Sequence, residues 1–238
     1  MGNLVGELTP KQEVAFLREI EGTRNLLAYG LRTIRDGAFL ETTREPILTM
    51  LSIGVEKLLK LALGCSQLST TNSWPSKGWM KSQGHGSAEM RASLLGVLDG
   101  REVPISEFVS NLRDQCGGSA LQGEIVRVLD TYGRWGRFYY LDRLGGVDQD
   151  WEGPEDAWTK IESVALEEGP LARLRDVAFE NVQNAEAFEV LLNGISSRIA
   201  DEIDLLWDLV AYAGMNHLLG RAGEVLGHEV HRSAVSRQ

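Results

Sequence analysis

The feature that most constrains the fold is an apolar repeat that runs through residues 185–219 without a proline. Apolar side chains recur there at steps of mostly three and four, at Phe188, Leu192, Ile195, Ile199, Ile203, Leu206, Val210 and Ala213. This spacing places the side chains on one face of an α-helix. The sequence therefore predicts a long helix that packs its apolar face against the rest of the chain.

Two further helices are predicted in the first third of the chain. Thr9, Pro10 and Gln12 form a capping box with proline at the first helical position, which predicts a helix over residues 10–36. A second helix is predicted to begin near Pro46 and to end at Gly64, a residue typical of helix C-termini. Both helices carry apolar positions that indicate packing in a core.

The remaining signals are helical too. Residues 65–84 predict an irregular, turn-rich connector, and helices are predicted after Ser87 and over residues 104–112, 120–144 and 154–167. No segment alternates apolar and polar residues for long enough to predict a strand. We therefore expect an all-α protein with about seven to nine helices.

Length, charge and cysteine content narrow the classes of function. The 238 residues predict one domain, or a core over residues 10–145 with additional helices over residues 154–231. A net charge of −10 argues against a general nucleic-acid coat protein, although a local basic patch remains compatible with it. Two cysteines in no metal-binding spacing, no secretion signal and no membrane-spanning segment predict a cytoplasmic protein with free thiols.

The second predicted helix carries charges among its apolar residues. Glu56, Lys57 and Lys60 lie along or beside one narrow polar stripe of that helix. Glu56 and Lys60 are four residues apart, so one interpretation is a solvated ion pair of small energetic value. The other interpretation is a polar groove between helices, in which these side chains bind a ligand.

Three segments resemble the HEPN superfamily, in particular its less characterised bacterial branch. They are IGVEKLLKLALG, the loop WPSKGWMKSQGHG and the later GRFYYLD, and the similarity covers roughly residues 10–145. The resemblance implies a helical bundle, frequent homodimerisation, and metal-independent RNA cleavage or nucleotide-related roles in toxin–antitoxin and antiphage systems. It also implies that the Gly-His at His85 acts in a pocket with Glu56 and Lys60. A single histidine that only makes a backbone hydrogen bond is the alternative.

Endonucleases of this superfamily share an arginine followed, after about four to six residues, by a histidine. Arg221 and His228 meet that spacing at its upper limit. Histidine transfers protons near neutral pH, and arginine stabilises charge developing on a phosphate. Ala222 departs from the polar residue that many active members carry after the arginine, and Gly223 and Gly227 weaken a helix in this segment.

Other groups of residues suggest weaker hypotheses. Arg134 and Arg137 lie among aromatic residues and close to Asp142, an arrangement that suits phosphate binding with base stacking, or simple ion pairing beside a core. Glu224, His228 and His231 have helical spacing for a metal, but with no fourth ligand a solvated tail is favoured and no cofactor or metal is expected.

These observations lead to two hypotheses for function. The first is a HEPN-like endoribonuclease of a bacterial toxin–antitoxin or antiphage system, with a homodimer as the expected assembly and RNA as the substrate. The second is a non-catalytic helical module in such a system that binds a partner protein encoded nearby. The acidic net charge suits the second hypothesis better.

Overall fold

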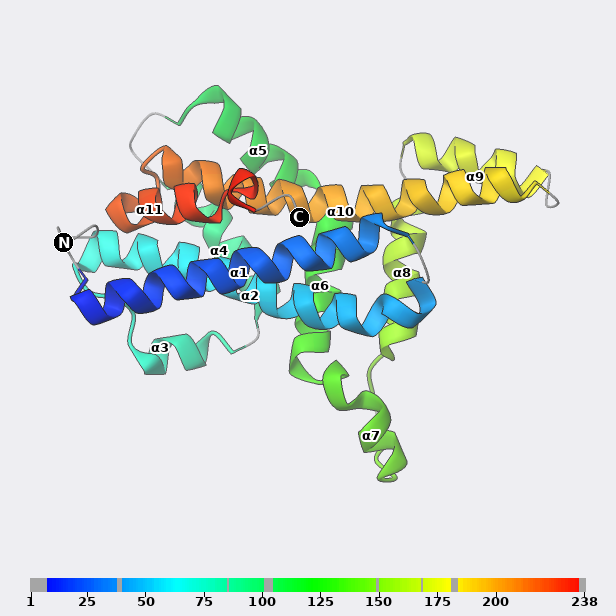
Figure 1. Ribbon diagram of the computed structural model, residues 1–238, viewed down its shortest axis with the longest axis horizontal. Helices are drawn as coiled ribbons and strands as arrows, with labels where there is room; N and C mark the ends of the chain where they lie inside the picture. The colour runs from blue at the N-terminus through cyan, green and yellow to red at the C-terminus, as the bar shows by residue number, and fades with distance from the viewer. Residues whose placement is uncertain are drawn as a thin grey trace.

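A computed structural model describes residues 8–37, 40–84, 86–100, 105–148, 150–167, 169–180 and 184–235. Within these ranges the chain forms helices α1 to α11 and two short 3-10 helices, and no strand occurs. The expected all-α class is therefore confirmed, with more helices than the seven to nine predicted. Figure 1 shows two long, nearly parallel layers, crossed by shorter helices at one end.

Helix α1 (Pro10–Arg35) confirms the predicted capping box. The hydroxyl of Thr9 accepts a hydrogen bond from the amide of Gln12, and the side chain of Gln12 accepts one from the amide of Thr9. These bonds satisfy two of the backbone donors that a helix N-terminus leaves without partners. The predicted start and end are both within one residue of the observed helix.

Helix α2 (Leu40–Thr71) is longer at both ends than the predicted helix. Pro46 lies inside it, near its N-terminal end, and has no amide hydrogen to donate to the preceding turn. Gly64 does not end the helix, so that prediction was wrong. A Cβ atom on Gly64 would lie 2.7 Å from a ring carbon of Trp74, so the glycine makes room for an indole to pack on the helix.

The predicted connector over residues 65–84 is therefore shorter and more ordered than expected. Its first residues belong to α2, and helix α3 (Lys77–Ser82) follows, capped by the hydroxyl of Ser76. Helix α4 (Ser87–Asp99) confirms the helix predicted after Ser87. Helix α5 (Glu107–Gly118) begins and ends later than predicted, and residue 104 lies outside the described residues.

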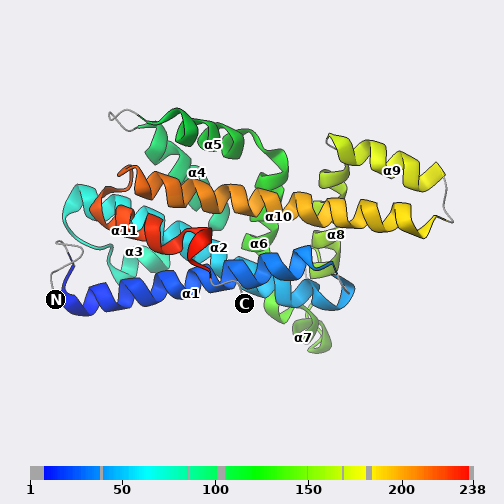
Figure 2. The ribbon, with the colours of Figure 1, turned by 45° about the horizontal axis from the view of Figure 1, so that its top comes forward.

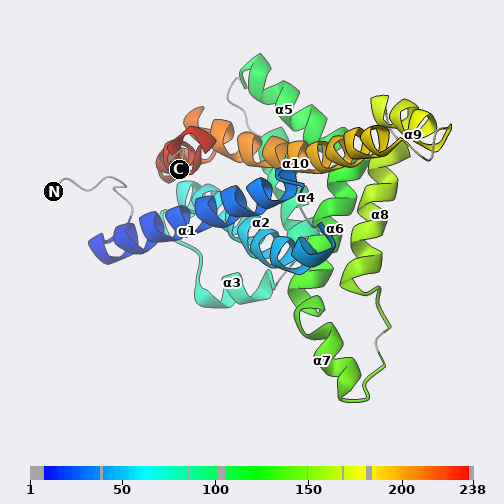
Figure 3. The ribbon, with the colours of Figure 1, turned by 45° about the vertical axis from the view of Figure 1, so that its right-hand side comes forward.

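The helix predicted over residues 120–144 is divided into three. Helix α6 (Ala120–Arg134) is followed by the 3-10 helix η1 (Gly136–Phe138) and by α7 (Tyr139–Leu144). The break falls in the segment GRWGRF, where two glycines lower the helix propensity. As a result, α7 projects from the bundle, at the bottom of Figures 1 and 3.

Helix α8 (Pro154–Glu167) confirms the prediction for this segment, whereas α9 (Pro170–Glu180) was not predicted. Helix α10 (Ala185–Met215) confirms most of the long apolar repeat. It ends before residue 219 because His217, at φ 60°, and Gly220, at φ 78°, take left-handed backbone conformations that reverse the chain. Helix α11 (Gly220–Val230) then packs back along α10, as Figure 2 shows, and η2 (Arg232–Ala234) follows.

The crossing of α10 and α11 depends on two glycines, Gly214 of α10 and Gly227 of α11. A Cβ on Gly214 would collide with the carbonyl of Gly223 and would lie 3.0 Å from Cα of Gly227. Gly223 and Gly227 do not break α11, which is continuous from Gly220 to Val230. The expectation that they weaken a helix in this segment was therefore wrong. At Gly227 the low helix propensity is offset because the missing side chain lets two helix backbones approach closely, whereas a Cβ on Gly223 would meet Leu219.

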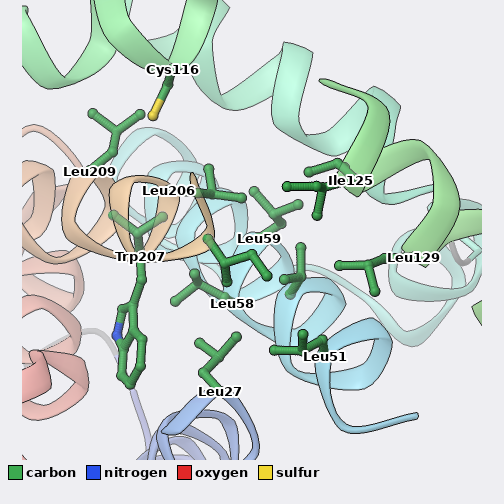
Figure 4. Packing of buried hydrophobic residues seen from close by; sticks show 14 of the residues in the cluster. Leu27, Leu51, Leu58, Leu59, Cys116, Ile125, Leu129, Leu206, Trp207 and Leu209 are labelled. Atoms are coloured by element: carbon green, nitrogen blue, oxygen red, sulfur yellow. The ribbon is translucent and has the colours of Figure 1, made fainter. Parts of the chain in front are cut away.

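The core joins helices from both ends of the chain. In Figure 4, Leu27 of α1, Leu58 and Leu59 of α2, Ile125 of α6 and Trp207 of α10 converge on one apolar region. One buried cluster extends from Leu8 to Val230. Its members therefore come from the predicted core and from the additional C-terminal helices alike.

Among the described residues, no helix is both long enough and apolar enough to cross a membrane.

The indole of Trp207 donates a 2.7 Å hydrogen bond to the carbonyl of Val230, the last residue of α11. This bond fixes the end of α11 against α10, and with it the surface that α11 presents to α1.

Candidate functional site

Helix α11 presents Arg221 and His228 on its exposed side. Its opposite side is buried through Ala222, Leu226 and Val230. Because the helix is continuous from Gly220 to Val230, two residues seven positions apart differ by about 20° around the axis and by about 10 Å along it. Arg221 and His228 therefore share one face, as their spacing suggests, and lie two turns apart.

These two side chains line a groove between α11 and α1, which we call the α1–α11 groove. Its lining includes Arg18, Glu21 and Arg24 from α1. From α11 it includes Arg221, Glu224, His228 and Glu229, with apolar Val14, Leu17 and Val225 at its sides. Three arginines and three glutamates balance there, so this surface is formally neutral in a chain of net charge −10.

Arg24 holds the far end of this groove. Its Nη1 donates a 2.7 Å hydrogen bond to the carbonyl oxygen of Glu229, in the last turn of α11. The bond supplies a donor and a positive charge at the C-terminal end of a helix, where both are favourable. Arg24 therefore fixes α11 against α1 next to His228.

Glu224 lies on α11 between the two candidate residues, three positions after Arg221 and four before His228. One of its oxygens is 3.4 Å from Nδ1 of His217, so its charge is directed in part towards the turn before α11. Within the part of the chain that the structure describes, neither Arg221 nor His228 forms an ion pair or a hydrogen bond through its side chain. Both side chains face solvent.

Glu56 and Lys60 form the ion pair that their spacing predicts. Nζ of Lys60 lies 2.7 Å from Oε1 of Glu56, and the two side chains are only 20% and 15% exposed. The same ammonium group donates a 2.7 Å hydrogen bond to the carbonyl of Gly84. The pair is therefore partly buried and secures the end of the α3 segment, and it is not a fully solvated edge.

Lys57 reaches across to α1, where its Nζ lies 2.9 Å from Oε1 of Glu19. Lys57 and Lys60 also line a pocket between α1, α2 and the α3 segment. His85, the third predicted member of this group, lies outside the described residues.

Arg134 forms ion pairs with two acidic residues, Asp130 and Glu89. Its Nε donates a 2.7 Å hydrogen bond to Asp130, and its guanidinium lies over the ring of Trp135. Burial raises the pKa of Asp130, and the ion pair with Arg134 opposes that rise. Nε of Arg137 is buried and has no hydrogen-bond partner among the described residues, and Asp142 is half-buried on α7. In Figures 1 and 3 this region is well separated from α11.

The structure therefore divides the predicted residues among three places. Arg221 and His228 lie in the α1–α11 groove, Glu56, Lys57 and Lys60 lie on α2, and Arg134, Arg137 and Asp142 lie around α6 and α7. Arg18 and Arg24 were not predicted to be site residues. Their signal was a polar stripe on α1 at a spacing of three and four residues, opposite the buried positions.

Metal ligation and cysteine chemistry find no support in these side chains. In the ranges that the structure describes, no group of three histidine, cysteine or acidic side chains is placed to hold a metal ion. His231, named above as a candidate ligand, instead contacts Ser233 and the hydroxyl of Tyr212. Burial raises the pKa of Cys116 to about 11 and also raises that of Cys65, so both thiols stay protonated near neutral pH.

Comparison of this chain with protein-family models, with curated proteins and with solved structures gives no match.

Proposed function

We propose that this protein is a HEPN-like, metal-independent endoribonuclease of a bacterial toxin–antitoxin or antiphage system, with its site in the α1–α11 groove. The observation that carries the proposal is the shared position of Arg221 and His228. Both side chains are exposed in one groove, and neither is matched by an acid within the described residues. Phosphate-binding and proton-transferring groups need this availability.

The groove suits a chain of phosphates better than a single compact ligand. Besides Arg221 and His228, the groove is lined by Arg18 and Arg24 from α1. Arginines spread along a groove can bind successive phosphates of a single strand. Glu21 and Glu224 moderate the attraction, which suits a substrate that must also be released.

In the proposed reaction, His228 in its neutral form accepts the proton of a ribose 2′-hydroxyl. The 2′-oxygen then forms a bond to the adjacent phosphorus, and the bond from phosphorus to the 5′-oxygen breaks. The leaving 5′-oxygen takes a proton from water or from the protonated imidazole. Arg221 binds the non-bridging oxygens, where negative charge builds up. The products are a 2′,3′-cyclic phosphate and a 5′-hydroxyl, and the mechanism uses no metal.

A homodimer remains the assembly that we propose, because the HEPN resemblance implies it. A second copy beside the groove would supply a second histidine and a second arginine, and this would give the leaving group its own acid. Sedimentation of the purified protein at tens of micromolar tests the assembly independently of cleavage.

A second candidate function is a non-catalytic interaction module. Large apolar side chains are exposed where η1 and α7 project from the bundle, namely Trp135, Phe138, Tyr140, Leu141, Leu144 and Val147. Apolar groups clustered on a projecting segment are typical of protein-binding surfaces. In this case the protein would act by binding a partner, and the α1–α11 groove would have no catalytic role.

Cleavage of labelled single-stranded RNA in the presence of a chelator distinguishes the two functions. We expect the wild-type protein to cleave, and Arg221→Ala and His228→Ala each to lower the rate by about 100-fold or more. Arg175→Ala is the matched control, since Arg175 lies on α9, outside the groove, is partly exposed and pairs with its neighbour Asp176. Equal inactivity of all four proteins towards RNA, with unchanged activity of the variants in cells, would favour the interaction module.

A further inference from the structure

A pocket on the side of α1 opposite the α1–α11 groove has the composition of a small-molecule site. Its volume is about 330 Å³, within the range of ligand-binding pockets. Apolar side chains from three segments form most of its lining, namely Leu8, Ala15, Phe16, Leu61, Trp74 and Met80. We call it the Trp74 pocket.

The wall containing Trp74 is held in place by specific contacts. The indole packs onto α2 where Gly64 has no side chain, and it meets the ring of Phe16 edge to face at 5.5 Å. Lys60 holds the α3 segment beyond it through the carbonyl of Gly84. Figures 1 and 3 show α3 standing off from α1 and α2. One wall of the pocket is therefore fixed by side-chain packing and by a hydrogen bond.

The charged groups of this pocket lie together at one part of its lining. Lys57 and Lys60 contribute two ammonium groups from neighbouring turns of α2, and Glu19 contributes one carboxylate from α1. The lining itself carries two positive groups and one negative group, and Lys60 is paired in addition with Glu56, which does not line the pocket. Glu19 is half-exposed at 49%, so an entering anion can compete with it for Lys57.

We propose that the Trp74 pocket binds a small amphipathic anion, with an apolar body against Trp74 and Phe16 and a single carboxylate between Lys57 and Lys60. An apolar lining with a few convergent polar groups fits such a ligand, because burial supplies affinity while the ammonium groups fix its orientation. The inference concerns the opposite side of α1 from the α1–α11 groove. It goes beyond the proposed RNA cleavage and does not depend on it.

Octanoate serves as the probe, and 1-octanol is its uncharged counterpart. In titration calorimetry we expect saturable one-to-one binding of octanoate to the full chain, with a dissociation constant on the order of 10–100 μM. Octanol should bind about tenfold more weakly, because it cannot use the two ammonium groups. Absence of saturable octanoate binding, or equal affinity for the two probes, would overturn the proposal.

Three variants locate the binding. Ala15→Trp adds an indole at an exposed, pocket-lining position of α1, so it should fill the pocket and weaken octanoate binding about tenfold or more without disturbing the core. Lys57→Met should weaken octanoate binding about fivefold and leave octanol binding unchanged. Glu19→Gln should strengthen octanoate binding about threefold, because it removes the competing carboxylate.

The matched control is Lys77→Met, which removes an exposed lysine of α3 that does not line the pocket. It should leave binding of both probes unchanged. Octanoate binding that survives Ala15→Trp, or that weakens in Glu19→Gln, would place the ligand elsewhere and contradict the proposal. Melting temperatures of all four variants, measured without ligand, separate loss of binding from loss of fold.

Discussion

Charged side chains of α2 and α11 lie on two sides of helix α1. The interactions that these charges make differ between the two sides. Towards α2, Lys57 lies 2.9 Å from Glu19, and Lys60 lies 2.7 Å from Glu56. Towards α11, Arg221 and His228 are exposed and form no ion pair within the part of the chain that the structure describes. On the first side both lysines have carboxylate partners, and on the second side Arg221 and His228 have none among the described residues.

This difference shows why charge spacing alone did not identify the site. Glu56 and Lys60, four residues apart, resemble both a structural ion pair and a polar groove, and their partial burial favours a structural contribution. Arg221 and His228 lacked a strong helix signal, yet helix packing places them together in an open groove. We therefore expect substitutions on the α2 side to lower stability, and substitutions on the α11 side to lower activity.

The largest expected effect on stability lies behind the α1–α11 groove, at the crossing of α10 and α11. Gly214→Val should lower the free energy of unfolding by about 3 kcal/mol, because its side chain would collide with the backbone of α11 at Gly223 and Gly227. Urea denaturation measures the change. The proposed RNA cleavage should be lost together with the packing of α11.

Gly96→Val is the control for this substitution. Gly96 lies on α4, and a Cβ there would have no neighbour within 4 Å. Its free energy of unfolding should change by less than about 0.5 kcal/mol, because valine and glycine differ little in helix propensity. Equal stability of Gly214→Val and Gly96→Val would show that α10 and α11 do not approach as closely as described.

A smaller effect is expected from matched substitutions on the two sides of α1. Glu56→Gln should lower the free energy of unfolding by about 1–2 kcal/mol, because it leaves the partly buried ammonium of Lys60 without its charged partner. Glu224→Gln, in the α1–α11 groove, should change it by less than about 0.5 kcal/mol. Thermal and urea unfolding of both variants measure the contrast. A larger loss of stability in Glu224→Gln than in Glu56→Gln would contradict the difference between the two sides of α1.

The smallest effect concerns pH and the segment that follows α11. Burial raises the pKa of Asp208, and the ion pair with Arg232 opposes that rise. Between the ordinary value of 3.8 and the raised value, the native protein holds a proton that the unfolded chain has lost. The contribution of Asp208 to stability therefore falls as pH rises through this interval.

Asp208→Asn removes this dependence. The free energy of unfolding of the variant minus that of the wild type should increase as pH rises through the interval. Denaturation at a series of pH values, with Asp176→Asn on exposed α9 as the control, measures it. A difference that decreases over the interval would contradict the direction of the pKa shift.

Local signals in the sequence predicted much of the fold. The capping box at Thr9 and Gln12 placed α1, and the long apolar repeat placed α10, because both features act within a few turns of one helix. Gly64 misled the prediction because its role is a contact with Trp74, a residue of the following segment. The end of α10 and the existence of α9 were also missed, because neither is marked by a strong local periodicity.

The candidate site could be predicted only in part. The ion pair of Glu56 with Lys60 and the common face of Arg221 and His228 follow from helical spacing. The contribution of Arg18 and Arg24 depends on how α1 packs beside α11, which no spacing within one helix reveals. A site between two helices far apart in sequence therefore needs the tertiary structure to be recognised.

The most direct test of the central claim is the chemistry at the ends of the RNA fragments. After incubation of a defined single-stranded RNA with the protein and a chelator, mass spectrometry should find 2′,3′-cyclic phosphate and 5′-hydroxyl ends. These products should disappear in Arg221→Ala and His228→Ala and persist in Glu56→Gln, compared under conditions in which each variant is folded. Products that persist in His228→Ala, or no cleavage by the wild-type protein across RNA substrates, would contradict a catalytic α1–α11 groove.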